Sequence, residues 1–376
     1  MTRDLILSSV RAIPLTASMQ AGTRTSQGDF GAVSIVLVEV RSADGVVGHG
    51  ECLARFGARA YALFINEVLA PKLLGQSAFD IRRLWEQMRA ALSGRAGGML
   101  IECIAGVDIA LWDLLGKALG QPVHRLIGGV GRVRVDCYAS SINWADTQAM
   151  RDQAQAVVAL GFKAIKVKLG QPVARAVEAA AAVRDAAGPT IAMAADANWA
   201  YSVDEAVKVG QALRALGYWF FEEPIRPEDL AGYRHLRSKL SIMLAAGESD
   251  TTVAHAAQLI APRLVGLIQP DVARAGGISE TRDIAALAHA HHVGYAPHVG
   301  WSGAICVAAS LQLAAAMPAF SSFECMFICN PLRDELCTAP VGDAASLVDG
   351  QLAVPQGPGL GVEIDWDAVQ RYRVDT

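Results

Sequence analysis

The sequence predicts an α/β protein built around a barrel of repeated strand–helix units, with an α+β domain in front of it. Short apolar runs recur at nearly constant intervals between residues 164 and 324, and each run ends in an ionisable residue. Stretches rich in alanine and leucine, with helical periodicity, separate the runs. Because a strand, a helix and two loops need roughly 25–30 residues, each interval corresponds to one βα unit.

Ionisable residues stand at the ends of these apolar runs. Separated by steps of 28, 26, 26, 23, 27 and 26 residues, they are Lys168, Asp196, Glu222, Glu248, Asp271, His298 and Glu324. The parallel strands of a (β/α) barrel place their carboxyl ends on one face, where enzymes of this architecture carry out their chemistry. We therefore expect these side chains to converge at one mouth of the barrel.

The region before the barrel predicts an α+β domain. Strand patterns with a hairpin turn signal at Asp44-Gly45 cover residues 4–15, 33–40 and 46–52. Helical patterns cover residues 58–69, 80–92 and 99–119. The last helix should end at Gly120, because Pro122 follows and cannot continue it.

The boundary between the two domains is expected near residue 128. Gly128-Gly129 precedes the first barrel strand, which we place at residues 133–139. This assigns residues 1–128 to the first domain and residues 129–347 to the barrel. The tail, residues 348–376, has no βα unit of its own, so we expect it to return and complete the first domain.

Length and composition fit a well-buried protein of more than one domain. The 376 residues exceed the roughly 200–250 of a barrel, and 52% hydrophobic content excludes a disordered chain. A net charge of -4 gives no reason to expect a nucleic-acid partner. The most apolar helical stretch, residues 304–317, is too short to cross a membrane. With no signal-peptide profile and seven scattered cysteines, we expect reduced thiols and a cytoplasmic location.

Lys166 and Lys168 are two positions apart on one predicted strand, so both side chains leave the same face, towards the barrel mouth. Two inward lysines are costly to bury unless something anionic lies between them. Their mutual repulsion predicts that the pKa of one of them falls into the range of a useful base. The alternative is an exposed lysine pair on an edge strand.

Three carboxylates, those of Asp196, Glu222 and Glu248, end consecutive predicted strands. They repel one another unless a cation lies among them, and ligation by oxygen alone favours Mg²⁺ over zinc. Asn198 shares a face with Asp196 and is a candidate to bind substrate. Glu223 alternates to the other face, so we expect it to pack or to form a salt bridge. The alternative for any single carboxylate is a helix N-cap or a solvated loop charge.

Asp271 and His298 end neighbouring predicted strands. A carboxylate beside an imidazole fixes the tautomer of the ring and raises its basicity, which is typical of a general acid or base. Glu324, on the next strand, is expected to face the substrate as a hydrogen-bonding carboxyl group.

Six short motifs occur together: Lys166-x-Lys168, Asp196-x-Asn198, Glu222-Glu223-Pro224, Gly247-Glu248, Pro270-Asp271 and Pro297-His298. As a set they resemble the enolase superfamily, mandelate racemase subgroup, and the resemblance covers essentially the whole chain. It implies a modified (β/α)7β TIM-like barrel with an N-terminal α+β capping domain, in a homo-oligomer. It also implies Mg²⁺ bound by the three carboxylates, Lys168 as one base with Lys166 as its modulator, and the Asp271–His298 dyad on the opposite side.

The resemblance further implies removal of a proton α to a carboxylate, which gives an enediolate. A lysine or histidine base working with Mg²⁺ is the pattern known for this superfamily. We expect loss of the β-hydroxyl assisted by His298 to follow, as in an acid-sugar dehydratase, with Lys166 and Glu324 near the developing charge. Two alternatives use the same residues: an aldarolactone cycloisomerase, and a racemase or epimerase of a hydroxy acid. A non-catalytic relative would have no reason to keep Lys168 and His298.

The far end of the substrate must be recognised from outside the barrel. Two loops of the first domain, residues 17–31 and 52–59, carry Arg24, Arg55 and Arg59 and little large apolar surface. Such donors favour a small polyhydroxylated carboxylate, a diacid or its lactone over an aromatic hydroxy acid. The alternative is that these arginines are simply solvated.

Overall fold

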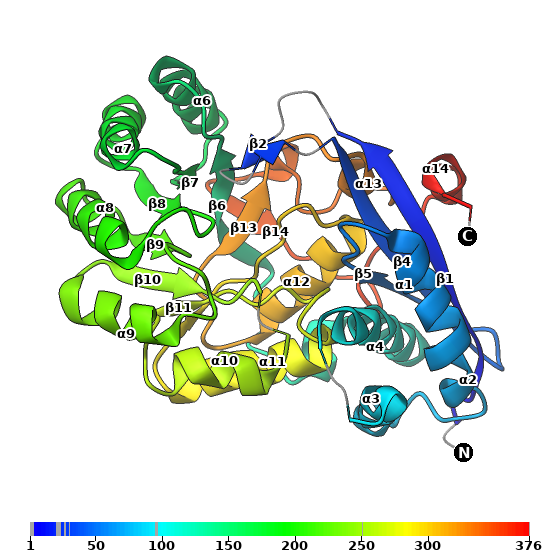
Figure 1. The fold of residues 1–376 in the computed structure, drawn as a ribbon. Helices are drawn as coiled ribbons and strands as arrows, with labels where there is room; N and C mark the ends of the chain where they lie inside the picture. Colours follow the sequence, from blue (N-terminus) through cyan, green and yellow to red (C-terminus); the bar gives the residue numbers. More distant parts are fainter. Residues whose placement is uncertain are drawn as a thin grey trace.

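The computed structural model describes residues 4–19, 24–25, 28–29, 31–94, 97–249 and 251–375. An antiparallel sheet with its helices lies beside a curled parallel sheet that helices surround (Figure 1). The chain is therefore a barrel of βα units with an N-terminal α+β part packed against it, which is the predicted fold class.

The N-terminal sheet has the strand order β1 (Leu7–Ser18), β4 (Ala32–Ser42) and β5 (Val47–Cys52). Helix α4 (Gly98–Leu119) packs directly on β5. A Cβ atom on Gly50 would lie 1.9 Å from the carbonyl oxygen of Gly106, so this close approach of strand and helix requires glycine. The helix ends, as predicted, at Gly120, which adopts a left-handed φ of 64°.

Shorter elements complete the N-terminal part. They are β2 (Arg24–Thr25), β3 (Gly28–Asp29), α1 (Ala58–Phe64), the π-helix η1 (Ile65–Leu69), α2 (Ala70–Leu73), α3 (Ile81–Arg89), the 3-10 helix η2 (Ala90–Leu92) and α5 (Val123–Leu126). The helix predicted at residues 58–69 is present, but its second half is π-helical and leads into α2.

Parallel strands form the barrel in the order β12–β11–β10–β9–β8–β7–β6–β13. Their bounds are β6 (Arg134–Ile142), β7 (Ala164–Lys168), β8 (Ala192–Asp196), β9 (Phe220–Glu222), β10 (Met243–Ala246), β11 (Leu267–Ile268), β12 (Gly294–Tyr295) and β13 (Phe323–Met326). Tyr295 of β12 also bridges to Phe320, just before β13, which brings the two ends of this order together.

A helix follows each barrel strand from β6 to β12, so the barrel has the (β/α)7β form. These helices are α6 (Thr147–Ala159), α7 (Val173–Ala187), α8 (Val203–Ala215), α9 (Leu230–Lys239), α10 (Val253–Ile260), α11 (Gly277–Ala290) and α12 (Ala304–Ala316). No helix among the described residues is both long and apolar enough to span a membrane.

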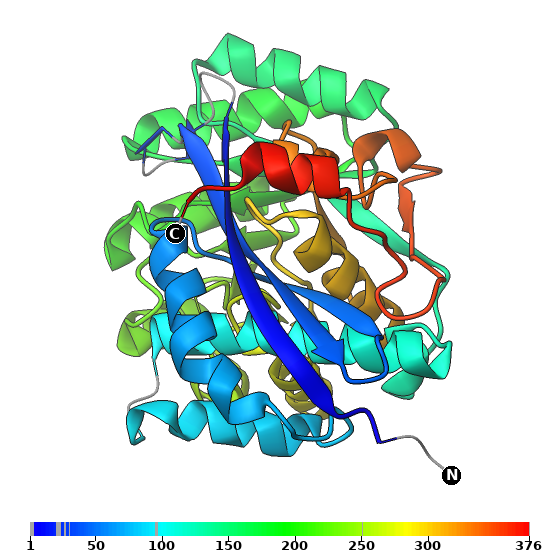
Figure 2. The same cartoon turned by 90° about the vertical axis from the view of Figure 1, so that its right-hand side faces the viewer.

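The C-terminal segment contacts both parts of the molecule. It contains α13 (Pro331–Asp334), the 3-10 helix η3 (Ala344–Ser346), β14 (Gln351–Ala353) and α14 (Trp366–Tyr372). Strand β14 pairs with β6 of the barrel, whereas α14 crosses the outer side of the N-terminal sheet (Figure 2). The Val374 N–H donates to the carbonyl oxygen of Pro14, 3.0 Å away, and so holds the end of the chain against β1.

A layer of apolar side chains fills the barrel interior below the mouth. Its members are Tyr138, Ala194, Phe220, Ala245, Leu267 and Ala296. Ala194, Phe220 and Ala296 each lie two residues before an ionisable residue of the predicted series, so the period of a strand places both on the inner side. The barrel is thus a packed core that carries its polar residues only at one end.

Candidate active site

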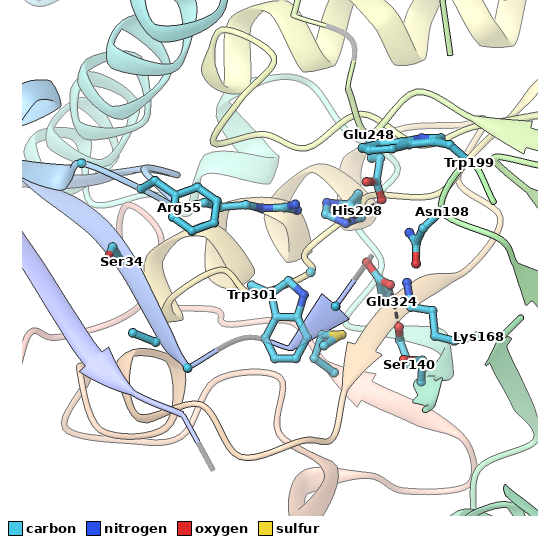
Figure 3. Close-up of a pocket in the computed structure, with 18 residues that line it drawn as sticks. Ser34, Arg55, Ser140, Lys168, Asn198, Trp199, Glu248, His298, Trp301 and Glu324 are labelled. Carbon is cyan, nitrogen blue, oxygen red and sulfur yellow. Dashed lines mark hydrogen bonds and ion pairs between the residues drawn. The ribbon is translucent and has the colours of Figure 1, made fainter. Parts of the chain in front are cut away.

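A cavity of about 510 Å³ lies at the carboxyl ends of the barrel strands, facing the N-terminal sheet (Figure 3). The barrel contributes Ser140, Ser141, Lys168, Asn198, Trp199, Glu248, His298, Gly300, Trp301, Glu324 and Met326 to its walls. The N-terminal part contributes Gly28, Gly31, Ala32, Ser34, Arg55, Phe56 and Gly57.

Strand register brings the first predicted residues side by side. Lys168 pairs with Asp196, and Asp196 pairs with Glu222, each as the last residue of its strand. The other positions differ from the prediction. Glu248 and the bridged pair Asp271 and His298 follow their strands by two or three residues, and Glu324 lies within β13. Strands β10, β11 and β12 are shorter than the apolar runs that predicted them, because Gly247, Pro270 and Pro297 interrupt the strand pairing.

Lys166 is fully buried at the centre of the mouth. Its Nζ lies 2.9 Å from Glu222 Oε1, 2.7 Å from Glu324 Oε1 and 3.7 Å from Asp196 Oδ2. Burial lowers the pKa of Lys166, but the negative charges of Glu222 and Glu324 outweigh burial and hold that pKa well above its usual value. Lys166 is therefore not a lysine of lowered pKa, because carboxylates rather than the second lysine are its nearest neighbours.

Lys168 differs from Lys166 in reaching the cavity. Its ammonium group forms an ion pair with Asp196, and its side chain is 11% exposed against 1% for Lys166. The Asn198 N–H donates to Asp196 Oδ1 over 2.8 Å, and Asn198 lines the cavity, as Figure 3 shows. Of the two lysines, only Lys168 is placed to touch a molecule in the cavity.

His298 lies between two carboxylates. Its Nδ1 is 2.8 Å from Asp271 Oδ2, and its Nε2 is 3.0 Å from Glu248 Oε2. Burial lowers the pKa of His298, but the charges of Glu248 and Glu324 and the hydrogen bond with Asp271 raise it to about 10. Burial likewise raises the pKa of Glu248, while the charge of His298 lowers it well below its usual value.

The carboxylates of Asp196, Glu222 and Glu248 are each held by a cationic side chain. Among the described residues, no three His, Cys, Asp or Glu side chains are gathered closely enough to form a metal cluster. The donor set nevertheless fits a divalent cation, because these are buried, hard oxygen donors from successive strands. Burial and the charge of Asp196 raise the pKa of Glu222 to about 7, so a further positive charge would be stabilised here.

Two residues at the mouth were not identified from the sequence as site residues. Gln269 Nε2 donates to Glu222 Oε2 over 2.8 Å, and Ser140 Oγ donates to Glu324 Oε1 over 2.7 Å. Gln269 stands two positions before Asp271, so strand periodicity is a signal that identifies it. The barrel position of Ser140 had no comparable signal.

Glu223 takes the first of its two expected roles, packing rather than a salt bridge. It is fully buried, follows the end of β9 with a φ of 36°, and accepts a hydrogen bond from the Trp199 indole. Burial and the nearby charges of Glu248 and Asp196 raise its pKa well above the usual value. It forms no salt bridge among the described residues, and its burial beside Trp199 is the packing role.

The three loop arginines occupy different positions. Arg55 lines the cavity and points towards His298 (Figure 3), and its Nε is buried without a hydrogen-bond partner among the described residues. Arg59 is exposed on α1 and does not line the cavity. Arg24 belongs to β2, but its side chain lies outside the described part of the structure.

Aromatic side chains form much of the remaining cavity wall. Phe56 is 80% exposed, and Trp199 and Trp301 both have a left-handed φ of 64°. The expectation of little apolar surface around the far end of the substrate is therefore wrong. Phe56 lies in the loop whose arginines were the main feature of the sequence, and the two tryptophans belong to loops of the barrel.

Two family models match most of the chain. Residues 9–128 match the N-terminal domain of the mandelate racemase / muconate lactonizing enzyme family, and residues 149–368 match the enolase C-terminal domain-like family. Together these matches cover both the N-terminal sheet and the barrel.

Individual relatives align over nearly their full length. The D-galactarolactone cycloisomerase of Agrobacterium fabrum is 35% identical, with 90% of this chain and 91% of the relative covered. The arabinonate dehydratase of Saccharolobus solfataricus is 34% identical, with 91% of each covered. A racemase from Streptomyces coelicolor with bound magnesium has a TM-score of 0.89 and 27% identity, covering 98% of this chain and 100% of that one. The chain belongs to the enolase superfamily, in its mandelate racemase subgroup.

Proposed function

We propose that the protein is a Mg²⁺-dependent acid-sugar dehydratase, which removes the proton α to a carboxylate and then eliminates the β-hydroxyl as water. The observation that carries this proposal is that Lys168 and His298 line one cavity from strands that are not neighbours. Two proton-transfer groups separated in this way can approach one substrate from different sides. The arabinonate dehydratase named above supports the same reaction class.

Asp196, Glu222 and Glu248 would hold the Mg²⁺. When bound, the ion supplies the positive charge that makes a proton α to a carboxylate acidic enough to remove. Binding would exchange the lysine and histidine partners of these carboxylates for the metal, which needs only side-chain movement at the mouth. The magnesium-bound racemase supports the choice of cation.

The protein residues then divide the proton transfers between them. Lys168, acting as the neutral amine, takes the α-proton and becomes the ammonium ion, since its Nζ position is open to the cavity. Glu324, held 2.7 Å from Lys166, lines the cavity and helps to orient the substrate, while the buried positive charge of Lys166 stabilises the developing negative charge from behind the cavity wall. His298, held by Asp271, gives a proton to the departing hydroxyl, which leaves as water and produces an enol that becomes the 2-keto acid. Asn198 binds the substrate beside Asp196.

Recognition of the substrate's far end falls to the N-terminal part. We assign this part to residues 1–128 with residues 348–376, and the barrel to residues 129–347. Arg55 offers a guanidinium, whose Nε has no hydrogen-bond partner among the described residues, to a hydroxylated chain, a second carboxylate or a lactone. The aromatic walls suit the C–H faces of a sugar acid as well as an aromatic ring, so Arg55 rather than the wall carries the preference for a polar substrate.

The second candidate is an aldarolactone cycloisomerase, which the cycloisomerase of Agrobacterium fabrum favours. It shares the first proton abstraction and differs only in the leaving group, which is the lactone oxygen. A racemase or epimerase, as the third candidate, would return the proton to the other face of the α-carbon.

A substrate screen tests these candidates. The protein with Mg²⁺ is incubated in deuterated water with aldonates, aldarates, their lactones and mandelate, and followed by proton NMR. The dehydratase predicts loss of the α-proton signal and formation of a 2-keto-3-deoxy acid from at least one sugar acid. Ring opening of a lactone alone would favour the cycloisomerase, and inversion without elimination would favour the racemase. Turnover of mandelate alone would contradict an acid-sugar function.

A further inference from the structure

The segment 51–55 carries the N-terminal sheet into the active site. It begins at the end of β5 and contacts the barrel with alternate residues. The Leu53 N–H donates to the carbonyl oxygen of Ala273, 3.3 Å away and two residues after Asp271. Arg55 lines the cavity, and Glu51 points to the start of α12. The segment therefore touches the loops that carry both members of the Asp271–His298 dyad.

Glu51 accepts hydrogen bonds from the free N–H groups at the N-terminus of α12, because the N-cap residue of this helix has no side chain to do so. Its carboxylate accepts from the N–H groups of Gly303, at 2.6 Å, and Cys306, at 3.0 Å. Gly303 is the N-cap and offers no side chain for this purpose. A Cβ on Gly303 would lie only 2.7 Å from Glu51 Oε2, so the first turn of α12 is shaped around this carboxylate.

Cys306, in that same first turn, contacts the dyad. Its Sγ lies 3.7 Å from Asp271 Oδ1, within reach of an S–H hydrogen bond. The same oxygen accepts the Ala273 N–H over 2.9 Å, which leaves Oδ2 to bind His298 Nδ1. These donors fix the carboxylate plane of Asp271, and that plane fixes the direction of the imidazole.

We propose that Glu51 is a positioning residue for His298, acting through the first turn of α12, Cys306 and Asp271. The N-terminal part of the chain then does more than cover the substrate, because it orients one of the two proton-transfer groups of the barrel. This inference rests on the proposed function, in which His298 protonates the departing hydroxyl.

Asp108 supplies a matched control. It is also a buried carboxylate of the N-terminal part, and it also binds the start of a barrel helix. It accepts from the N–H group and the hydroxyl of Ser279 in the first turn of α11, at 3.0 Å and 2.6 Å. No hydrogen bond joins the Asp108 side chain to Asp271 or His298 among the described residues. A purely structural role for such carboxylates predicts the same consequences from Glu51→Gln and Asp108→Asn.

Nuclear magnetic resonance of the histidine side chains tests the positioning directly. In ¹⁵N-histidine-labelled protein with Mg²⁺, the His298 Nδ1–H signal is assigned by its loss in His298→Asn. We expect this signal to shift in Glu51→Gln and Cys306→Ala, to return towards the wild-type position in Cys306→Ser, and to stay in place in Asp108→Asn. A signal unmoved in both Glu51→Gln and Cys306→Ala would overturn the proposal.

Kinetics of the same variants provide the second readout. We expect Glu51→Gln and Cys306→Ala to lower product formation roughly 10- to 100-fold, which is the usual cost of losing an outer-shell partner. The KM and the exchange of the α-proton with solvent deuterium should be preserved, because Lys168 carries that step. An equal loss in Asp108→Asn would overturn the proposal. If the NMR shifts appear but the wild-type protein turns over no sugar acid, the proposed function is wrong and the positioning role stands.

Discussion

Two sets of buried carboxylates, at the junction of the two parts and at the barrel mouth, differ in the donors that chiefly bind them. At the junction stand Glu51, Asp108 and Asp113, and at the mouth stand Asp196, Glu222 and Glu248. All six are at most 4% exposed. Burial alone therefore does not distinguish a structural carboxylate from a functional one.

The junction carboxylates accept hydrogen bonds from main-chain N–H groups. Asp113 of α4 shows this pattern and reaches the C-terminal tail. Its carboxylate accepts from the N–H groups of His49 and Leu360, each at 2.8 Å, and also pairs with the Lys117 ammonium. A main-chain N–H group cannot rotate away from its acceptor, because the helix or loop that carries it fixes its direction. These carboxylates hold the two parts of the molecule together.

The mouth carboxylates are each paired with a cationic side chain, although Asp196 also accepts the Asn198 N–H. Asp196, Glu222 and Glu248 are paired with Lys168, Lys166 and His298, whose cationic groups stand on rotatable side chains. Such partners can be exchanged for a metal ion or a substrate. Among the described residues, every mouth carboxylate has a cationic side-chain partner, whereas of the three junction carboxylates Asp113 alone has one, Lys117.

The largest expected effect comes from the two proton-transfer groups of the mouth. We expect Lys168→Ala and His298→Asn each to lower turnover of the sugar acid by about 10²- to 10⁴-fold, the range for loss of a general acid or base. His298→Asn should still exchange the α-proton with solvent deuterium, whereas Lys168→Ala should not. Steady-state kinetics and proton NMR measure the two quantities. Near wild-type turnover in both variants would refute these roles.

The junction should make stability depend on pH. Burial raises the pKa of Glu51 and of Asp108 to about 7. The folded state therefore binds protons more tightly than the unfolded state, and the contribution of each group to stability, complete below about pH 4, is lost as the pH rises to about 7. Relative to Asp108→Asn or Glu51→Gln, wild-type protein should lose on the order of a few kcal/mol per group across this window. Urea unfolding at several pH values measures the free energy of unfolding of wild type and each variant. A difference between them that stays constant with pH would contradict the prediction.

Replacing one carboxylate in each set should change stability in opposite directions. We expect Asp108→Ala to lower the free energy of unfolding by about 1–3 kcal/mol, because the Ser279 donors at the start of α11 lose their acceptor. Glu222→Gln should leave the free energy of unfolding unchanged or raise it by up to about 1–2 kcal/mol, since it relieves repulsion among converging carboxylates. Urea unfolding at pH 7 compares the two, and the reverse order would remove the distinction between the sets.

The smallest effect is expected at the far end of the cavity. Arg55→Ala should raise the KM for an aldarate or its lactone about tenfold, or ~1.4 kcal/mol, because the guanidinium loses its contact with the substrate. Arg59→Ala is the matched control, as that side chain is exposed and does not line the cavity. Equal KM values in wild type and Arg55→Ala would exclude Arg55 from recognition.

Much of the mouth was predictable because barrel geometry is periodic. The spacing of Lys168, Asp196 and Glu222 follows from one βα unit per interval, and strand register then places them side by side. The same logic located Glu248 and His298 in the cavity wall, although both lie beyond their strands. A local period predicts the face on which a residue lies better than it predicts the end of a strand.

Residues whose place depends on loop conformation or distant contacts could not be predicted. The left-handed φ of Glu223, just after β9, and its hydrogen bond with the Trp199 indole have no counterpart in the alternation of a strand. Cys306 appeared as one scattered thiol, and only the packing of α12 brings it to Asp271. Arg55 and Arg59, four residues apart, looked equivalent in the sequence, yet the turn at Gly57, with a φ of 75°, leaves only Arg55 in the cavity.

The most direct test of the account is a calorimetric titration of Mg²⁺ into three proteins: wild type, Glu222→Gln from the mouth and Asp108→Asn from the junction. The account predicts one Mg²⁺ site of equal affinity in wild type and Asp108→Asn. In Glu222→Gln the affinity should fall by at least about 100-fold, since loss of an outer-shell partner alone costs 10- to 100-fold. Undiminished binding by Glu222→Gln, or no binding by the wild-type protein, would contradict the assignment of the mouth carboxylates as the metal site.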